Sequence, residues 1–250
     1  MRSRLPVVLF VLMMLVCFAA GAISVLLKGE EQEPIPQSTP FESIEIAPTA
    51  LNQSGAVSIL VLGVDEIKLE KPKILSIWFI SFQPPDKKIQ LLGIPTDLLL
   101  PDTDTPLSEA FSLWEAPDYG ADFITAMDHF SPNPIFGIAV LDEEGFSALI
   151  DYLGGFSLDD QSYDGASAIG TLRLLADQPL IALKLQAQIL RALSVKAPDL
   201  GKTPELTPLT LLLPEHAYTS PSPAQLATLA SPLLPLRADL IEITIYKTTP

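Results

Sequence analysis

Residues 134–159 read PIFGIAVLDEEGFSALIDYLGGFSLD, and the first half of this stretch predicts a strand followed by a helix. The apolar run IFGIAVL (135–141) is typical of a strand that is buried on both faces. Asp142 can cap a helix over residues 143–152 by accepting a hydrogen bond from its first turn. The apolar residues of this segment form one stripe at helical spacing: Phe146, Leu149, Ile150 and Leu153.

The second half of the stretch predicts a return to a strand. Gly154 and Gly155 can end the helix because glycine readily adopts positive φ. The residues FSL (156–158) then read as a second strand. Strand, helix and strand together form a crossover, which is the building block of an α/β sheet.

The flanking segments extend this pattern into one α/β domain with a central mixed β-sheet flanked by helices. Upstream, strands are predicted over 58–64, 74–82 and 88–94, followed by short helices over 106–114 and 122–130. Downstream, the spacing predicts helices over 164–176 and 179–194 and a last, edge strand over 239–246.

The N-terminal segment Leu5–Leu27 contains 23 residues without a charge, enough to cross a bilayer as one transmembrane helix. Arg2 and Arg4 precede it and acids follow it, so we expect a cytoplasmic N-terminus and an extracytoplasmic remainder, on a single-pass protein of the cell membrane. A signal peptide cleaved after Ala22 is the alternative. The expected division of the chain is a cytoplasmic tip and anchor (1–28), a flexible linker (29–53) and an α/β domain (54–250) closed by the proline-rich residues 196–250.

Composition excludes several classes of function. The net charge is −15, and without the cations of the anchor, Arg2, Arg4 and Lys28, residues 29–250 carry −18, which disfavours nucleic acid as a partner. The one cysteine, Cys17, falls in the apolar anchor, so the outer domain has neither a disulfide nor thiol chemistry. His129 and His216 lack the neighbouring ligands of a zinc site.

Five stretches of the chain resemble the LytR-CpsA-Psr family, whose domain is also known as the cell envelope-related transcriptional attenuator domain. Residues 134–159 align without a gap with the family stretch PIDYYVVVDFEGFKKLVDALGGVEVD. ILVLGVDE (59–66) resembles the family's first strand and GxD turn, and SFQPPDKKIQLLGIPTD (81–97) resembles its hairpin ending in IPRD. YDGASAIGTLRLLA (163–176) resembles the helix DGEQALAYVRxR, and LQAQILRAL (185–193) resembles RQQxVLKAL.

The resemblance implies a chemistry. Family members transfer a glycopolymer from a polyprenyl pyrophosphate to peptidoglycan, with Mg²⁺ and several arginines holding the pyrophosphate and the lipid tail lying in an apolar tunnel. Cations suit this reaction because negative charge develops on the leaving pyrophosphate. Four residues match the family motifs: Asp65, a candidate metal ligand, and the candidate catalytic residues Asp97, Arg173 and Gln186. The candidate ligand-binding residues are Arg173, Gln186 and Lys73, a lysine that stands at a family arginine position.

The departures from the family pattern remove charge. Lys73 and Leu75 stand where the family has the arginine and aspartate of RSDT. Uncharged residues replace four family arginines: Thr96, Leu175, Ala182 and Leu185. Removing one charge-stabilising donor from a reaction of this kind typically costs about 10²–10³ in rate.

We therefore expect a membrane-anchored domain linked to cell-envelope glycopolymer assembly that is impaired in phosphotransfer, needs no cofactor, and binds polyprenyl lipid or scaffolds other envelope-synthesis proteins. An active Mg²⁺-dependent transferase that uses the four matching residues together with Lys73 is one alternative. A purely structural module, whose pocket is filled by side chains such as Leu75, Leu175 and Leu185, is another.

Overall fold

The structure is a computed structural model that describes residues 56–69, 71–83, 88–100, 103–110, 117–196, 215–221, 225, 229 and 238–247. The expected anchor and linker lie outside these residues. Among the helices within them, none has the length and hydropathy needed to cross a bilayer.

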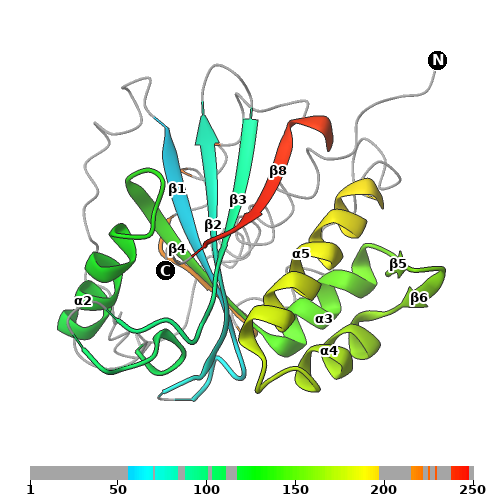
Figure 1. Ribbon diagram of the computed structural model, residues 1–250, viewed down its shortest axis with the longest axis horizontal. Coiled ribbons are helices and arrows are strands. Elements are labelled where there is room, and N and C mark those ends of the chain that lie inside the picture. The colour runs from blue at the N-terminus through cyan, green and yellow to red at the C-terminus, as the bar shows by residue number, and fades with distance from the viewer. Residues whose placement is uncertain are drawn as a thin grey trace, which may run out of the picture.

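A six-stranded mixed sheet forms the centre of the fold, as the sequence predicts (Figure 1). Its strand order is β7-β4-β1-β2-β3-β8. The β1–β4 and β3–β8 pairs are parallel, and the other three neighbouring pairs are antiparallel. The bounds are β1 Val57–Val64, β2 Ile74–Gln83, β3 Lys88–Ile94, β4 Ile135–Asp142, β7 Ala217–Thr219 and β8 Ile241–Ile245.

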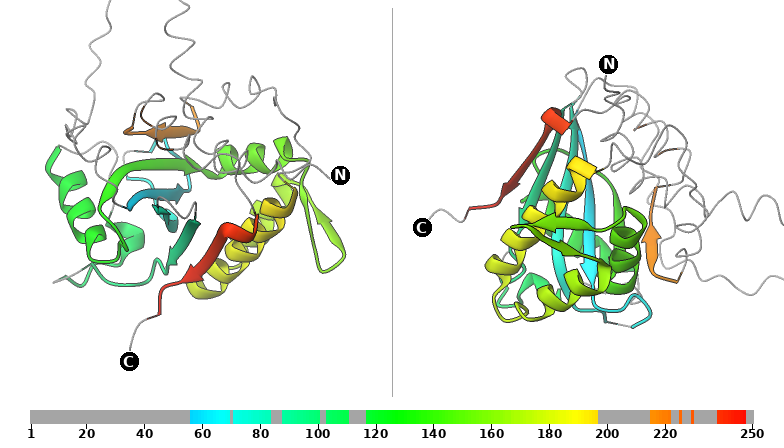
Figure 2. Two further views of the ribbon diagram at one scale, coloured as in Figure 1. Left: turned by 90° about the horizontal axis from the view of Figure 1, so that it is seen from above. Right: turned by 90° about the vertical axis from the view of Figure 1, so that its right-hand side faces the viewer.

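Helices cover both faces of this sheet, so the domain has three layers (Figures 1 and 2). On one face lie α3 (Glu143–Tyr152), α4 (Gly165–Arg173) and α5 (Pro179–Lys196), which pack on sheet residues such as Trp78 and Ile80. On the other face α2 (Pro117–Asp128) packs on the alternate residues, among them Ile77 and Phe79. Successive side chains of a strand point to opposite faces, so a continuously apolar strand supplies both cores.

The α3 helix begins and ends where its local sequence predicts. The Asp142 side chain accepts a hydrogen bond from the Gly145 N–H at 2.8 Å, which caps the helix. Gly154 and Gly155 follow its end with φ of 76° and 68°. A side chain at Gly155 would also collide with the carbonyl of Tyr163. This position therefore requires glycine for two reasons, its positive φ and the lack of space.

The predicted crossover is wrong in its last step. Residues 156–158 do form a strand, β5 (Phe156–Leu158), but it pairs with β6 (Gln161–Tyr163) in a separate two-stranded hairpin. The parallel neighbour of β4 in the main sheet is β1, which precedes it in the chain. Strand type was therefore predicted correctly, and strand partner was not.

The predicted helix over 106–114 is also wrong across its described part. Residues 107–109 form only a single 3₁₀ turn, η2 (Leu107–Glu109), and residues 111–116 lie outside the described residues. The Leu107 N–H donates to the Leu98 carbonyl at 2.7 Å, and the Ser108 N–H donates to the Thr96 carbonyl at 2.9 Å. These bonds attach the 3₁₀ turn to the segment after β3.

The other predicted helices shift by a few residues. The α2 helix ends at Asp128 rather than at residue 130, and α4 ends at Arg173 rather than at residue 176. A second short 3₁₀ turn, η5 (Ala238–Leu240), leads into β8, which lies at the edge of the sheet as predicted.

Candidate functional site

A cavity of about 150 Å³ lies between the sheet and the α3–α5 layer. The parallel strands β1 and β4 both end at it, and its wall also includes the start of β2, the end of α4 and the first half of α5. Ligands of α/β proteins commonly bind beyond the carboxyl ends of parallel strands. The position of the cavity is therefore that of a binding site.

Most of the cavity wall is apolar. Its aromatic side chains are Trp78 from β2 and Phe146 from α3, and aliphatic side chains supply most of the rest. These include Val61, Ile74, Leu75, Ile80, Leu91, Leu141, Ile169, Leu172, Leu175 and Leu190. Such a wall suits an apolar ligand, because contact with it removes apolar surface from water on both sides.

Among the described residues, four with ionisable side chains line the cavity, and their formal charges cancel. Lys73 and Arg173 are cations, whereas Asp142 and Glu143 are carboxylates. Arg173 Nε lies 3.0 Å from Glu143 Oε2, and Arg173 Nη2 lies 2.5 Å from the same oxygen. The hydrogen bonds and negative charge of Glu143 raise the pKa of Arg173 above its ordinary value. Arg173 therefore already has an anionic partner within the chain.

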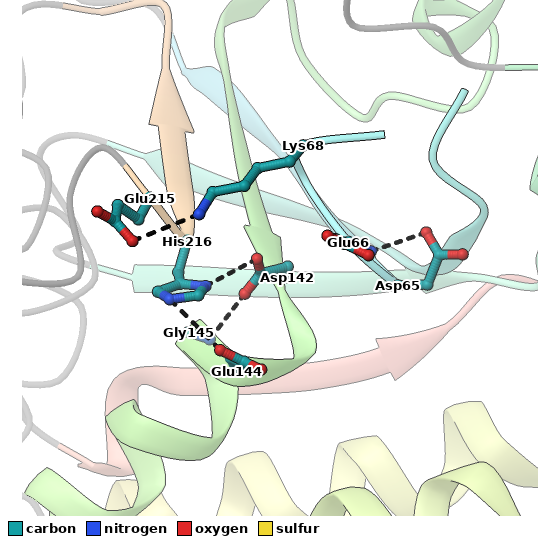
Figure 3. A network of polar contacts seen from close by, with 8 residues as sticks. All are labelled: Asp65, Glu66, Lys68, Asp142, Glu144, Gly145, Glu215 and His216. Carbon is teal, nitrogen blue, oxygen red and sulfur yellow. Dashed lines mark hydrogen bonds and ion pairs between the residues drawn. The ribbon is translucent and has the colours of Figure 1, made fainter. Parts of the chain in front are cut away.

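Asp142 is also engaged, as Figure 3 shows. One carboxylate oxygen accepts from Gly145 N, and the other lies 3.0 Å from His216 Nδ1. The other ring nitrogen of His216 lies 3.4 Å from Glu144 Oε2. The His216 carbonyl in turn accepts from the Asp142 N–H at 3.1 Å, so β7 is fastened to the start of α3. His216, which looks isolated in the sequence, joins these elements.

Gln186 lies inside the cavity wall and is buried. Its Oε1 accepts from Trp78 Nε1 at 3.2 Å, and its Nε2 donates to the Leu75 carbonyl at 3.4 Å. These bonds hold the amide between α5 and β2. The indole is thereby kept in position as part of the apolar wall.

The structure brings three of the five predicted site residues to this cavity: Lys73, Arg173 and Gln186. Asp97 is exposed at the exit of β3 and does not line it. Asp65 does not line it either; its Oδ1 accepts from the Glu66 N–H at 2.8 Å and the Lys73 N–H at 2.9 Å. Asp65 therefore holds the connection between β1 and β2 in shape. Figure 3 shows its contact with Glu66.

Several positions at which the chain departs from the family pattern also face the cavity. Thr96, Leu75, Leu175 and Ala182 all line it, whereas Leu185 does not. The expected loss of charge is thus located at the cavity itself. Sequence reasoning missed Glu143 as a site residue, because nothing local indicates that a helix-start glutamate will meet an arginine 30 residues later.

The residues present do not fit the Mg²⁺ ion that the family resemblance implies. Among the described residues, no group of three or more His, Cys, Asp and Glu side chains could hold a metal ion. Leu75, which stands where a family carboxylate would, lines the cavity and has a hydrocarbon side chain that offers no metal ligand. Protein Mg²⁺ sites commonly use one or two carboxylates together with water and substrate phosphates. Here the carboxylates of Asp142 and Glu143 are already bonded within the chain, and Asp65 lies outside the cavity lining.

Comparisons with known proteins agree with this architecture. The polyisoprenyl-teichoic acid–peptidoglycan teichoic acid transferase TagU of Bacillus mycoides is 23% identical over 168 residues, covering 64% of this chain and 53% of the relative. The TagU of Bacillus anthracis is 25% identical over 147 residues, covering 55% of this chain and 47% of the relative. The chain thus spans about half the length of these curated relatives.

Solved structures share the fold. TagV of Bacillus subtilis superposes with a TM-score of 0.57 at 18% identity, covering 79% of this chain and 86% of TagV. A LytR-Csp2A-Psr enzyme from Actinomyces oris superposes with a TM-score of 0.60 at 17% identity, covering 77% of this chain and 81% of the enzyme. No protein-family model matches the chain.

Proposed function

We propose that this chain, a divergent member of the LytR-CpsA-Psr family, serves cell-wall glycopolymer assembly by binding the apolar chain of a polyprenyl lipid without carrying out phosphotransfer. The TagU relatives are named for a polyisoprenyl-linked substrate. An apolar cavity is the feature that this chain would need in order to bind such a lipid.

One observation supports the proposal above the others: the cavity is open and apolar, while its charged groups cancel one another. A pyrophosphate needs an excess of cations, since its negative charge increases as it leaves. Two cations opposed by two carboxylates give no such excess. An isoprenoid chain needs only carbon surface, which this wall supplies.

The size of the cavity limits how much lipid it can enclose. A dry protein cavity of about 150 Å³ holds a molecule of the size of benzene. The enclosed part of the ligand therefore has about the size of one isoprene unit, and the rest of a polyprenyl chain would remain outside. A domain anchored by residues 1–28 and a linker over 29–53 would be held close to the bilayer that contains such chains.

One observation favours an active transferase instead: Lys73, Arg173 and Gln186, all predicted from the family, line the same cavity. Against it stand the Glu143–Arg173 ion pair and the positions of Asp65 and Asp97 outside the cavity lining. A purely structural module is disfavoured because Leu75 and Leu175 line the cavity without filling it.

Trp78 provides the test, because its indole lines the cavity. The only other tryptophan in the chain is Trp114, so a Trp114→Phe background reports Trp78 alone. The full chain in mild detergent would be titrated with geraniol, geranyl phosphate and geranyl diphosphate, each with and without Mg²⁺. We expect a saturable change in fluorescence with geraniol that is independent of Mg²⁺. Diphosphate binding that depends on Mg²⁺ would support the transferase, and no binding would support the structural module.

A matched pair of variants locates the binding. Ala182→Phe fills the cavity from α5 and should abolish the response, because Ala182 lines it. Ala166→Phe makes the same change on the exposed face of α4, away from the cavity lining, and should leave the response unchanged.

A further inference from the structure

Among the described residues, Arg173 is the one arginine that lines the cavity, and it forms an ion pair with Glu143. Glu143 is the first residue of α3, and its side chain is only 15% exposed, whereas that of Arg173 is 65% exposed. Arg173 donates from Nε to Glu143 Oε1 at 3.1 Å and from Nη2 to Glu143 Oε2 at 2.5 Å. Parallel bonds from these two nitrogens are also one way in which a guanidinium binds a phosphate, so one of the two bidentate edges of Arg173 is already in use.

The start of α3 offers no replacement site for an anion. Helix N-termini attract anions through their unpaired N–H groups and the helix dipole. Here the chain's own carboxylates are in that place: Asp142 accepts from Gly145 N, and Glu143 and Glu144 occupy the first turn. A diphosphate that approached Arg173 would meet these negative charges.

The groups left to meet a ligand's polar end are mostly neutral hydrogen-bonding groups. Ser76 and Thr96 line the cavity, as does Gln186, whose amide already bonds to Trp78 and Leu75. Lys73 is the one further cation among the described residues that line it. Such groups can satisfy a hydroxyl without a change in charge. They cannot balance the two or three charges of a diphosphate.

From these contacts we propose that Glu143 is a specificity-determining residue that makes the cavity prefer a prenyl chain with an uncharged head, a prenol, over a prenyl diphosphate. The inference rests on the proposed function, because it presumes that a prenyl chain enters the cavity. The aligned family stretch has Phe in place of Glu143, so the carboxylate is a feature of this chain. Its effect is to change the head group that the site accepts while leaving the apolar wall intact.

The Glu143→Gln variant removes the charge and keeps the size. Two unit charges about 4 Å apart change an equilibrium by roughly fivefold in bulk water and nearly a thousandfold at the effective dielectric of a protein surface. We therefore expect geranyl diphosphate to bind at least about tenfold more tightly to Glu143→Gln, and geraniol to bind within about twofold of the wild type. Glu143→Phe, which introduces the residue of the family stretch, should shift the preference in the same direction.

Glu144→Gln is the matched control. It removes the same charge from the same helical turn, but Glu144 is 81% exposed and does not line the cavity. Its effect on diphosphate affinity should be less than about threefold, because solvent screens an exposed charge. Thermal unfolding of each variant, followed by circular dichroism, confirms that all are folded.

The outcomes separate the two proposals. Geraniol binding with unchanged diphosphate affinity in both Glu143 variants overturns the role of Glu143 and leaves the proposed function standing. Wild-type chain that binds diphosphate as tightly as geraniol also overturns it. If neither ligand binds to any variant, the proposed function fails together with the inference.

Discussion

Removing the carboxylate of Asp142 is expected to destabilise the domain more than the loss of an ordinary helix cap. The side chain is 4% exposed, caps α3 through Gly145 N and contacts His216 Nδ1 at 3.0 Å. Loss of an N-cap costs about 1 kcal/mol, and a partly buried polar group left without its partner costs about 1–2 kcal/mol more. The Asp142→Ala variant should therefore lose about 2–3 kcal/mol of unfolding free energy.

Urea denaturation of the full chain in mild detergent, followed by far-ultraviolet circular dichroism, measures this loss. With a slope of about 2 kcal/mol per molar urea, the midpoint should fall by about 1 M or slightly more. Asp164→Ala is the matched control: Asp164 caps α4 through Ser167 N at 2.8 Å, but it is exposed. The control should lose clearly less stability.

A double-mutant cycle isolates the contact with His216. His216→Ala combined with Asp142→Ala should cost less than the sum of the single changes by about 1 kcal/mol, because both remove the same contact. Equal losses for Asp142→Ala and Asp164→Ala, together with additive behaviour in the cycle, would refute the assigned role of the Asp142–His216 pair.

Three further predictions concern the cavity and the acid stability of the domain. Gln186→Leu should cost about 1–3 kcal/mol in the same urea assay, because it leaves Trp78 Nε1 and the Leu75 carbonyl without their partner; a neutral effect would contradict this. Hydrogen bonds from Ser167 lower the pKa of Asp164 below its ordinary value of 3.8. The ionised carboxylate therefore stabilises the fold above pH 3.8, and this stabilisation is lost as the pH falls through the lowered pKa. Thermal unfolding of both proteins between about pH 5 and about pH 3 should therefore show a smaller loss of stability for Asp164→Asn than for the wild type. An equal loss in the two proteins would contradict this role of Asp164. Thr96→Arg alone should restore no transfer of labelled glycopolymer to peptidoglycan, because Leu75, Leu175 and Ala182 still lack the charges of the family pattern; measurable turnover would show the reasoning to be wrong.

Local signals in the sequence were enough to predict individual elements. The bounds of α3 agree because its cap, Asp142, and its terminating glycines lie within a few residues of the helix. Apolar runs likewise predicted β1, β2 and β3. These features depend on backbone geometry and burial that a short window contains.

Partners remote in the chain could not be predicted in this way. The three residues of β7 have no strand periodicity of their own, and they become a strand by pairing with β4. Residues 106–114 have helical spacing, yet the amides of Leu107 and Ser108 bond to the segment that follows β3. In both cases the observed structure comes with contacts to a segment elsewhere in the chain, which a local pattern does not contain.

The residues of the candidate site also divide into those that the sequence predicted and those that depend on partners remote in the chain. Alignment with family motifs identified Lys73, Arg173 and Gln186, all of which line the cavity. It did not reveal that Arg173 pairs with Glu143, or that Asp142 pairs with His216, 74 residues away. Whether a side chain that matches a family motif is available to a ligand depends on such contacts, which only the folded structure contains.

The most direct measurement is a crystal structure of the full chain grown with geranyl diphosphate and Mg²⁺. We predict an apolar chain against Trp78 and Phe146, an intact Glu143–Arg173 ion pair, and no ordered diphosphate or metal at the mouth of the cavity. A diphosphate bound between Lys73 and Arg173 with a coordinated metal, and with Glu143 displaced, would contradict the account.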